Sequence, residues 1–127
     1  MRFMVMVKGN PDYEAGQPPS PELMTAVGNL TRDHMAAGIV VDTGGLYPSS
    51  KGALIRASGG NLTVIDGPFA ETKEVIGGYA IIEAKSKEEA IQHARQFMQV
   101  HIDVLGPSYE GECELAKCSS DCPFAIG

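Results

Sequence analysis

Two helix starts constrain the fold of this chain more than any other feature of its sequence. The first is Ser20-Pro21-Glu22, in which a serine caps the helix, a proline suits its first turn and an acid meets the positive end of the helix dipole. The second is Ser86-Lys87-Glu88-Glu89, the pattern of a capping box. Short apolar runs of strand length, residues 2–8 and 79–84, precede the two helices. The chain therefore alternates strands with helices.

Turn residues place the remaining elements. We predict a loop over residues 11–21 and an end of the first helix at Gly38, a residue type that commonly closes helices. Residues 39–47, 53–56 and 61–65 are expected strands, and Ser58-Gly59-Gly60 joins the last two as a β-hairpin. The second helix is expected to stop at Gly106-Pro107, and residues 109–117 form a last strand with one wet face.

The resulting order, β-α-β-β-β-β-α-β, contains the two βαβ units of a ferredoxin-like α+β sandwich with an inserted β-hairpin. We expect residues 1–117 to form a single domain and residues 118–127 to form a C-terminal tail. Two helices cover one face of an antiparallel sheet, whereas residues 3–7 and 80–82 are apolar on both sides. A second copy of the chain is the simplest cover for the other face, so we expect a homodimer.

Composition argues against several kinds of partner. The 127 residues carry a net charge of −6 with a pI near 4.9, and the ten basic residues are scattered, unlike those of a nucleic-acid footprint. No apolar stretch approaches the ~18 residues of a membrane span, and the N-terminal run is too short for a signal peptide. We therefore expect a cytoplasmic protein that binds neither nucleic acid nor a membrane.

The three cysteines lie close to the end of the chain. An odd number of them, Cys113, Cys118 and Cys122, suits a reducing compartment. Their spacing lacks the four ligands and the paired knuckle that a zinc site needs. We expect no metal and no other cofactor, and the sequence leaves the role of these cysteines open.

The densest group of candidate functional side chains lies in residues 65–74, called here the DGPF loop after Asp66-Gly67-Pro68-Phe69. The glycine and proline must turn the chain, so the preceding strand ends at Asp66. The loop thus carries a carboxylate at a strand end, an aromatic anchor in Phe69 and a positive charge in Lys73. This concentration is typical of a site.

Two histidines and one further acid are candidates for the same site. His34 and His101 each lie near the end of an apolar helix face, and imidazole suits proton transfer near neutral pH. We expect the second helix to fray before His101. By the two-residue alternation of strands, Asp42 lies on the same side as Gly44 and is a candidate partner for His34. The alternative for both histidines is a structural place at the edge of the core.

The stretch IDGPFAETKEVIGGYAIIE, residues 65–83, resembles the signature of the DGPF, or YCII-related, family of small bacterial proteins. The resemblance extends to about residue 115 and implies a dimeric α/β-barrel built on a ferredoxin-like fold. It also implies two kinds of function, because a His and an Asp face each other in a cleft of related proteins and some members are linked with alternative sigma factors. The chain departs from the family pattern at Gly44, where an acid is common, and at His34, where an aliphatic residue is common. The other matching segments are Arg2-Phe3-Met4, Ala37-Gly38, Gly45-Leu46, Pro48-Ser49-Ser50-Lys51-Gly52 and Ser86-Lys87-Glu88-Glu89-Ala90.

Three functions follow from these residues. In the first, a cleft beside the DGPF loop performs acid–base chemistry on a small molecule. Asp66 is then the base or the group that orients it, His34 or His101 is its proton partner, and Lys73 clamps an anionic substrate. Phe69 and Asp42 are further candidates for contact with that substrate.

The two alternatives need no catalysis. In one, the protein is a ligand-sensing or protein-interaction module with the DGPF loop as its recognition surface, since no serine or cysteine lies in a nucleophile motif. In the other, the loop is structural: Asp66 accepts hydrogen bonds from loop N–H groups, and Glu71 pairs with Lys73 across the dimer. Whether the protein is an enzyme stays open at this point.

Overall fold

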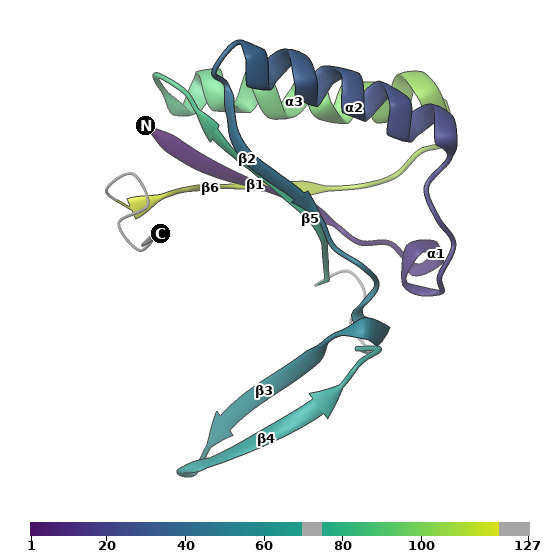
Figure 1. Ribbon diagram of the computed structural model, residues 1–127, viewed down its shortest axis with the longest axis vertical. Helices are drawn as coiled ribbons and strands as arrows, with labels where there is room; N and C mark the ends of the chain where they lie inside the picture. Colours follow the sequence, from purple (N-terminus) through teal and green to yellow (C-terminus); the bar gives the residue numbers. More distant parts are fainter. Residues whose placement is uncertain (70–74, 120–127) are drawn as a thin grey trace.

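The computed structural model of the chain describes residues 1–69 and 75–119. Two long helices lie on one side of a four-stranded sheet, and a two-stranded hairpin extends from the other side (Figure 1). The elements in chain order are β1 (Arg2–Lys8), α1 (Pro11–Glu14), α2 (Pro21–Ala36), β2 (Val40–Gly45), the 3-10 helix η1 (Ser49–Lys51), β3 (Ala53–Ser58), β4 (Asn61–Asp66), β5 (Ile76–Glu83), α3 (Lys87–Leu105) and β6 (Cys113–Lys117).

The main sheet has the strand order β2-β5-β1-β6, and every pair of neighbours is antiparallel. In the register of β1 and β5, Met4 lies opposite Ile81 and Met6 opposite Tyr79. Together with α2 and α3, these strands follow the chain order β-α-β-β-α-β. This mixed α+β architecture with antiparallel sheets confirms the predicted class and is compatible with a ferredoxin-like fold.

Both predicted helix starts are confirmed. The side chain of Ser20 accepts a hydrogen bond from the N–H of Leu23 at 3.1 Å, and that of Ser86 accepts one from the N–H of Glu89 at 3.1 Å. These bonds satisfy N–H groups that a helix end leaves without a partner. After α2, Gly38 adopts a φ of 75°, a conformation that favours glycine.

Two predictions about helices were wrong. Residues 11–14 form the short helix α1 and not a loop, because the side chain of Asn10 caps the N–H of Tyr13 at 2.9 Å and Pro11 fills the first turn. The second helix does not fray before His101. It continues to Leu105, and His101 is buried with 8% of its surface exposed.

The core lies between the main sheet and the two long helices. Its buried side chains come from the strands through Phe3, Val5 and Ile82 and from α3 through Ala90 and Ala94. Since successive side chains of a strand point to opposite faces, Met4 and Met6 of β1 face away from the helices. This open face of the main sheet is covered by neither α2 nor α3 (Figure 1).

The predicted hairpin turn is also confirmed. β3 and β4 pair from Ala53 opposite Asp66 to Ser58 opposite Asn61, and they form a sheet of their own. Gly59 and Gly60 turn the chain with φ values of 59° and 80°, the positive angles that a tight hairpin turn requires. In Figure 1 the hairpin points away from the side that carries the helices.

Strand ends differ by a few residues from the predicted ones. β2 ends at Gly45 and β5 begins at Ile76, so that Gly77 and Gly78 lie inside a strand. β6 begins only at Cys113. Within the described part of the chain, no helix has the length and apolar character needed to cross a membrane.

Candidate functional site

Ser49 anchors the described part of the DGPF loop. Its hydroxyl accepts a hydrogen bond from the backbone N–H of Phe69 at 3.0 Å, and its side chain is buried, with 6% of the residue exposed. The carboxylate of Glu14 accepts two hydrogen bonds from the same residue, one from the backbone N–H at 2.7 Å and one from the hydroxyl. A carboxylate, a serine and a loop N–H group thus form one chain of hydrogen bonds.

The backbone of the loop is packed as closely as its hydrogen bonds suggest. Gly67 donates its N–H to the carbonyl oxygen of Gly52 at 3.1 Å, and a Cβ at position 67 would overlap the backbone oxygen of Ser49. Only glycine fits against a backbone at this distance. The peptide bond between Gly67 and Pro68 is cis.

Helix α1 closes this end of the sheet through Tyr13 and Glu14. The hydroxyl of Tyr13 donates to the carbonyl oxygen of Leu46, just after β2, while Glu14 contacts Ser49 in η1. Nearby, Gly9 donates its N–H to the carbonyl oxygen of Val75 at 2.6 Å. The ends of β1, β2 and β5 therefore meet α1, η1 and the DGPF loop at one place in the fold.

Asp66 lies at the start of this loop, at the end of β4 and opposite Ala53. Asp66 is exposed, and its carboxylate has no hydrogen bond or ion pair within residues 1–69 and 75–119. The structural alternative, in which Asp66 accepts N–H bonds from the loop, therefore has no support among these residues. The serine at position 49 performs that task instead.

Asp42 lies on the open face of the main sheet. It pairs with Ile81 and Gly44 pairs with Tyr79, so the predicted alternation of Asp42 and Gly44 is confirmed. Its carboxylate accepts the N–H of Thr43 at 2.9 Å and lies 3.5 Å from the hydroxyl of Tyr79. A Cβ at position 44 would lie 2.9 Å from the ring of Tyr79, so the glycine makes room for that ring.

His34 occupies α2, on the opposite face of the sheet from Asp42. Its ring stands edge-on to the ring of His93, with centroids 5.6 Å apart. Both ring nitrogens of His93 are buried without a hydrogen-bond partner in the described chain, although Nε2 lies 3.5 Å from a carboxylate oxygen of Glu89. No described hydrogen bond or ion pair joins His34 to Asp42 or Asp66.

His101 belongs to an aromatic cluster at the end of α3. Its Nδ1 lies 2.9 Å from the carbonyl oxygen of Phe97, and since a carbonyl only accepts, Nδ1 carries the proton. Its ring centroid lies 4.7 Å from that of Phe97 and 5.3 Å from that of Tyr109. Burial, and secondarily Cys113, raises the pKa of Tyr109 above its usual value of 10.0. These contacts explain the burial of His101 without a ligand.

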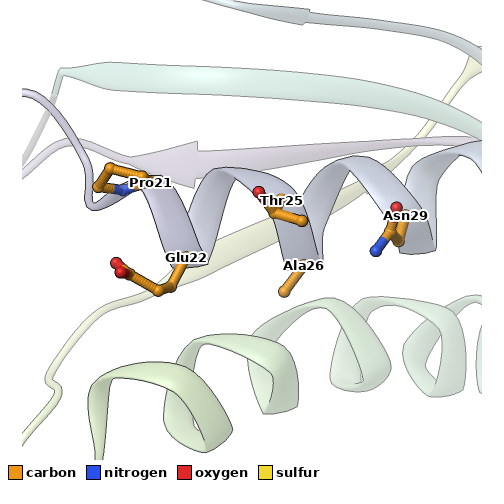
Figure 2. A pocket seen from close by; sticks show the side chains of 5 residues that line it. All are labelled: Pro21, Glu22, Thr25, Ala26 and Asn29. Carbon is orange, nitrogen blue, oxygen red and sulfur yellow. The ribbon is translucent and has the colours of Figure 1, made fainter.

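Two shallow depressions lie on the helices and not at the DGPF loop. The first follows the exposed side of α2 and is lined by Pro21, Glu22, Thr25, Ala26 and Asn29 (Figure 2). The second lies between α2 and α3 and includes His34, Asp33 and Asp103. Neither contains Asp66 or Phe69.

The cysteines do not form a metal site in the part of the chain that the structure describes. Cys113 and Cys118 are half-buried, and the described residues contain no group of three or more ligating side chains that could hold a metal ion. Burial raises the pKa of the Cys113 thiol above its usual value of 9.0. Lys73, Glu71 and Cys122 lie outside the described residues, so their predicted roles stay predictions.

Sequence reasoning missed the two residues with the strongest contacts to the loop, Glu14 and Ser49. Glu14 was expected in a loop, and Ser49 belongs to no pattern of catalytic residues. Their partners are 35 and 20 residues away in the sequence, beyond any local spacing rule. The available signal was Asn10-Pro11, a helix cap followed by a proline. This pair predicts the short helix α1, which carries Glu14.

The fold and this junction define a small α+β protein in which Gly67 and Phe69, just after the hairpin, are held by hydrogen bonds to Gly52 and Ser49. The YCII-related domain matches residues 1–104, so the chain belongs to the YCII-related family, to which the name DGPF also refers. It is 37% identical over 73 residues to an uncharacterized protein of Rhizobium meliloti (strain 1021). This similarity covers 58% of the chain and 59% of that protein, so the chain spans less than two thirds of its relative.

Proposed function

We propose that the protein binds a small molecule in a cleft beside the DGPF loop and that Asp66 is the acid–base group there. The observation that carries this proposal is the contrast between Asp66 and its surroundings. The backbone at Gly67 and Phe69 is held by hydrogen bonds to Gly52 and Ser49, whereas the carboxylate of Asp66 is exposed and has no described partner. A fixed backbone with a free carboxylate suits the binding or deprotonation of an O–H or N–H group.

The proposed proton partner of Asp66 is His34 or His101, and both histidines have other contacts in the described structure. His34 contacts His93, and His101 uses Nδ1 for the carbonyl oxygen of Phe97. Either histidine has to approach Asp66 within hydrogen-bond reach or through one water to serve. Lys73 is the proposed clamp for an anionic substrate, and Phe69 and Asp42 are proposed contacts.

We further propose that the active unit is a homodimer, a dimeric α/β-barrel whose open sheet faces pack on each other, with the β3–β4 hairpin as an insertion in the ferredoxin-like fold. Met4, Met6, Tyr79 and Ile81 form the apolar centre of the open face and are only half-buried in one chain. The charges at its rim are already paired, Arg2 with Glu83 at 2.7 Å and Lys8 with Glu114 at 4.0 Å. Asp42 on the same face has no described ion pair, but its carboxylate contacts the N–H of Thr43 and the hydroxyl of Tyr79. The two ion pairs reduce the charge repulsion between two such faces.

A thermal-shift screen of polar small molecules tests the site. We expect a compound that raises the melting temperature of the wild type but not that of Asp66→Asn. The matched control is Asp33→Asn, which changes an exposed aspartate on α2 in the same way. Compounds that stabilise all three proteins equally would contradict a role of Asp66 in binding.

A second candidate function is a protein-interaction module. It is favoured by the hairpin, where Ile55, Leu62 and Val64 are exposed by 66%, 75% and 65%. An apolar surface of this kind usually marks an interface.

A further inference from the structure

The β3–β4 hairpin has two chemically different faces. Because opposite residues of an antiparallel pair point to the same side, Ile55 shares a face with Val64, and Ala57 shares it with Leu62. The other face carries the apolar pair Leu54 with Ile65 near the base and the polar pairs Arg56 with Thr63 and Ser58 with Asn61 toward the turn. The outer part of the hairpin is therefore amphipathic, and Asp66, opposite Ala53, ends the apolar face at its base.

The apolar side has no cover within the described chain. Its three large side chains, Ile55, Leu62 and Val64, are each exposed by 65% or more. The two strands contact each other extensively but make no comparable contact with any other helix or strand of the described residues. An isolated two-stranded hairpin is marginally stable in water, and it gains stability when its apolar face packs on another surface.

The base of the hairpin is nevertheless firmly held. Gly67, next after β4, donates to Gly52, just before β3, and the adjoining Phe69 and Ser49 are joined by a second hydrogen bond. The hydrogen bonds from Ser49 to Glu14 continue this network into α1. The hairpin is thus a projecting arm with a fixed root, whose apolar face is presented in a defined direction.

We propose that this apolar face packs against a second copy of the chain, so that each protomer holds its partner with its hairpin. The inference rests on the homodimer of the proposed function and adds a second contact surface to it. In Figure 1 the hairpin extends on the side of the main sheet opposite α2 and α3. A partner seated on the open face therefore lies on the side from which the hairpin projects, and two-fold symmetry covers both hairpins at once.

The size of the interface supports this occupant. By the alternation of strand residues, about a dozen side chains of β1, β2, β5 and β6 point to the open face. A stable interface engages ~20–30 residues on each side. The open sheet face alone falls short of that range, and the apolar face of the hairpin supplies a large part of the difference.

Charge disfavours two other occupants. The chain has a net charge of −6, and Arg56 is the one basic residue within β3 and β4. Moreover, Arg56 lies on the face opposite Ile55 and Val64, so it does not support docking of the apolar face. Anionic membranes and nucleic acids attract basic surfaces, which this hairpin lacks.

Paired lysine substitutions on the two faces of the hairpin test the proposal by sedimentation equilibrium. The variant Ile55→Lys/Val64→Lys changes the apolar face, and the control Ser58→Lys/Thr63→Lys adds the same charge to the polar face. We expect the first variant to weaken dimerisation by ~100-fold or more, because charges enter a desolvated contact, and the control to change it by less than ~5-fold. Circular dichroism checks that each variant keeps its secondary structure.

The outcomes separate this inference from the dimer on which it rests. If the wild type is a dimer and both variants have the same dissociation constant, the hairpin contact is overturned but the proposed homodimer stands. If the wild type is a monomer at tens of micromolar, both the hairpin contact and the homodimer are overturned. If the first variant unfolds, hydrogen exchange of the wild type decides. The exchange of the β3 and β4 amides is measured at protein concentrations above and below the dissociation constant of the dimer. Slower exchange at the higher concentration supports the contact, and equal exchange overturns it.

Discussion

The carboxylate of Glu14 accepts two hydrogen bonds from Ser49, one from the backbone N–H and one from the hydroxyl. The hydroxyl of Ser49 in turn accepts a hydrogen bond from the N–H of Phe69. This relationship links α1, η1 and the DGPF loop, which lie far apart in the sequence. It positions Phe69 by means of a partly buried polar network. Since Glu14 and Phe69 both form their hydrogen bonds with Ser49, we expect a substitution of Ser49 to lower the stability of the fold.

Ser49→Ala removes the acceptor of the Phe69 N–H and the hydroxyl donor to Glu14, while the backbone N–H of residue 49 remains. We expect the free energy of unfolding to fall by about 2 kcal/mol, because a partly buried N–H group loses its partner. Urea denaturation measures this change. Ser50→Ala is the matched control on the neighbouring exposed serine and is expected to stay within ~0.5 kcal/mol of the wild type. Equal losses in both variants would show that the network contributes nothing.

A double-mutant cycle tests whether Glu14 and Ser49 act as one unit. Glu14→Ala and Ser49→Ala each break the same contact, so the double variant is expected to lose about 1 kcal/mol less than the sum of the single losses. Ser49→Ala combined with Glu88→Ala, an exposed residue in α3, is expected to be additive. Additivity in both pairs would argue that the Glu14 contact does not contribute to stability.

The two helix caps and the hairpin turn could be predicted from the sequence, because each depends on residues within three or four positions of one another. Ser20, Ser86 and Gly59 illustrate this. The contact between Glu14 and Ser49 could not be predicted, since it exists only after β1 and β2 come together. The burial of His101 likewise depends on a contact with Tyr109, a residue that lies beyond the end of α3.

Gly67 is expected to tolerate no side chain. In Gly67→Ala the new methyl group meets the backbone oxygen of Ser49, which cannot move without breaking the network, so we expect a loss of about 3 kcal/mol. Gly28→Ala is the opposite case, because no atom lies within 4 Å of the new methyl group inside α2. That variant is expected to gain ~0.5–1 kcal/mol from helix propensity. Thermal unfolding of both variants and of the wild type measures whether each substitution lowers or raises the stability.

Stability is expected to depend on pH through Glu83. The hydrogen bond from Arg2 lowers the pKa of this carboxyl below its usual value of 4.5. A carboxyl whose pKa is lowered by folding stabilises the fold above its unfolded pKa, and the contribution is lost as the pH falls through the folded pKa. Wild type should therefore be more stable than Glu83→Gln near pH 7, and the difference should shrink below about pH 4.5.

Unfolding from pH 7 to pH 3 at constant protein concentration follows this difference. Glu110→Gln serves as control, since Glu110 is exposed and has no described ion pair. Its difference from the wild type is expected to be flat over the same range. A constant difference for Glu83→Gln as well would contradict the role of Arg2.

Cys113 is expected to react slowly with thiol reagents in the folded protein. Its thiol is half-buried against the core, and burial raises its pKa, so that less of the reactive thiolate is present near neutral pH. We expect alkylation by iodoacetamide at pH 7.5 to be at least ~10-fold slower in buffer than in 6 M urea, where the shift is lost. Mass spectrometry of the peptide that contains Cys113 measures both rates. Equal rates would mean that solvent reaches this thiol in the native state, and they would contradict the packing of Cys113 against the core.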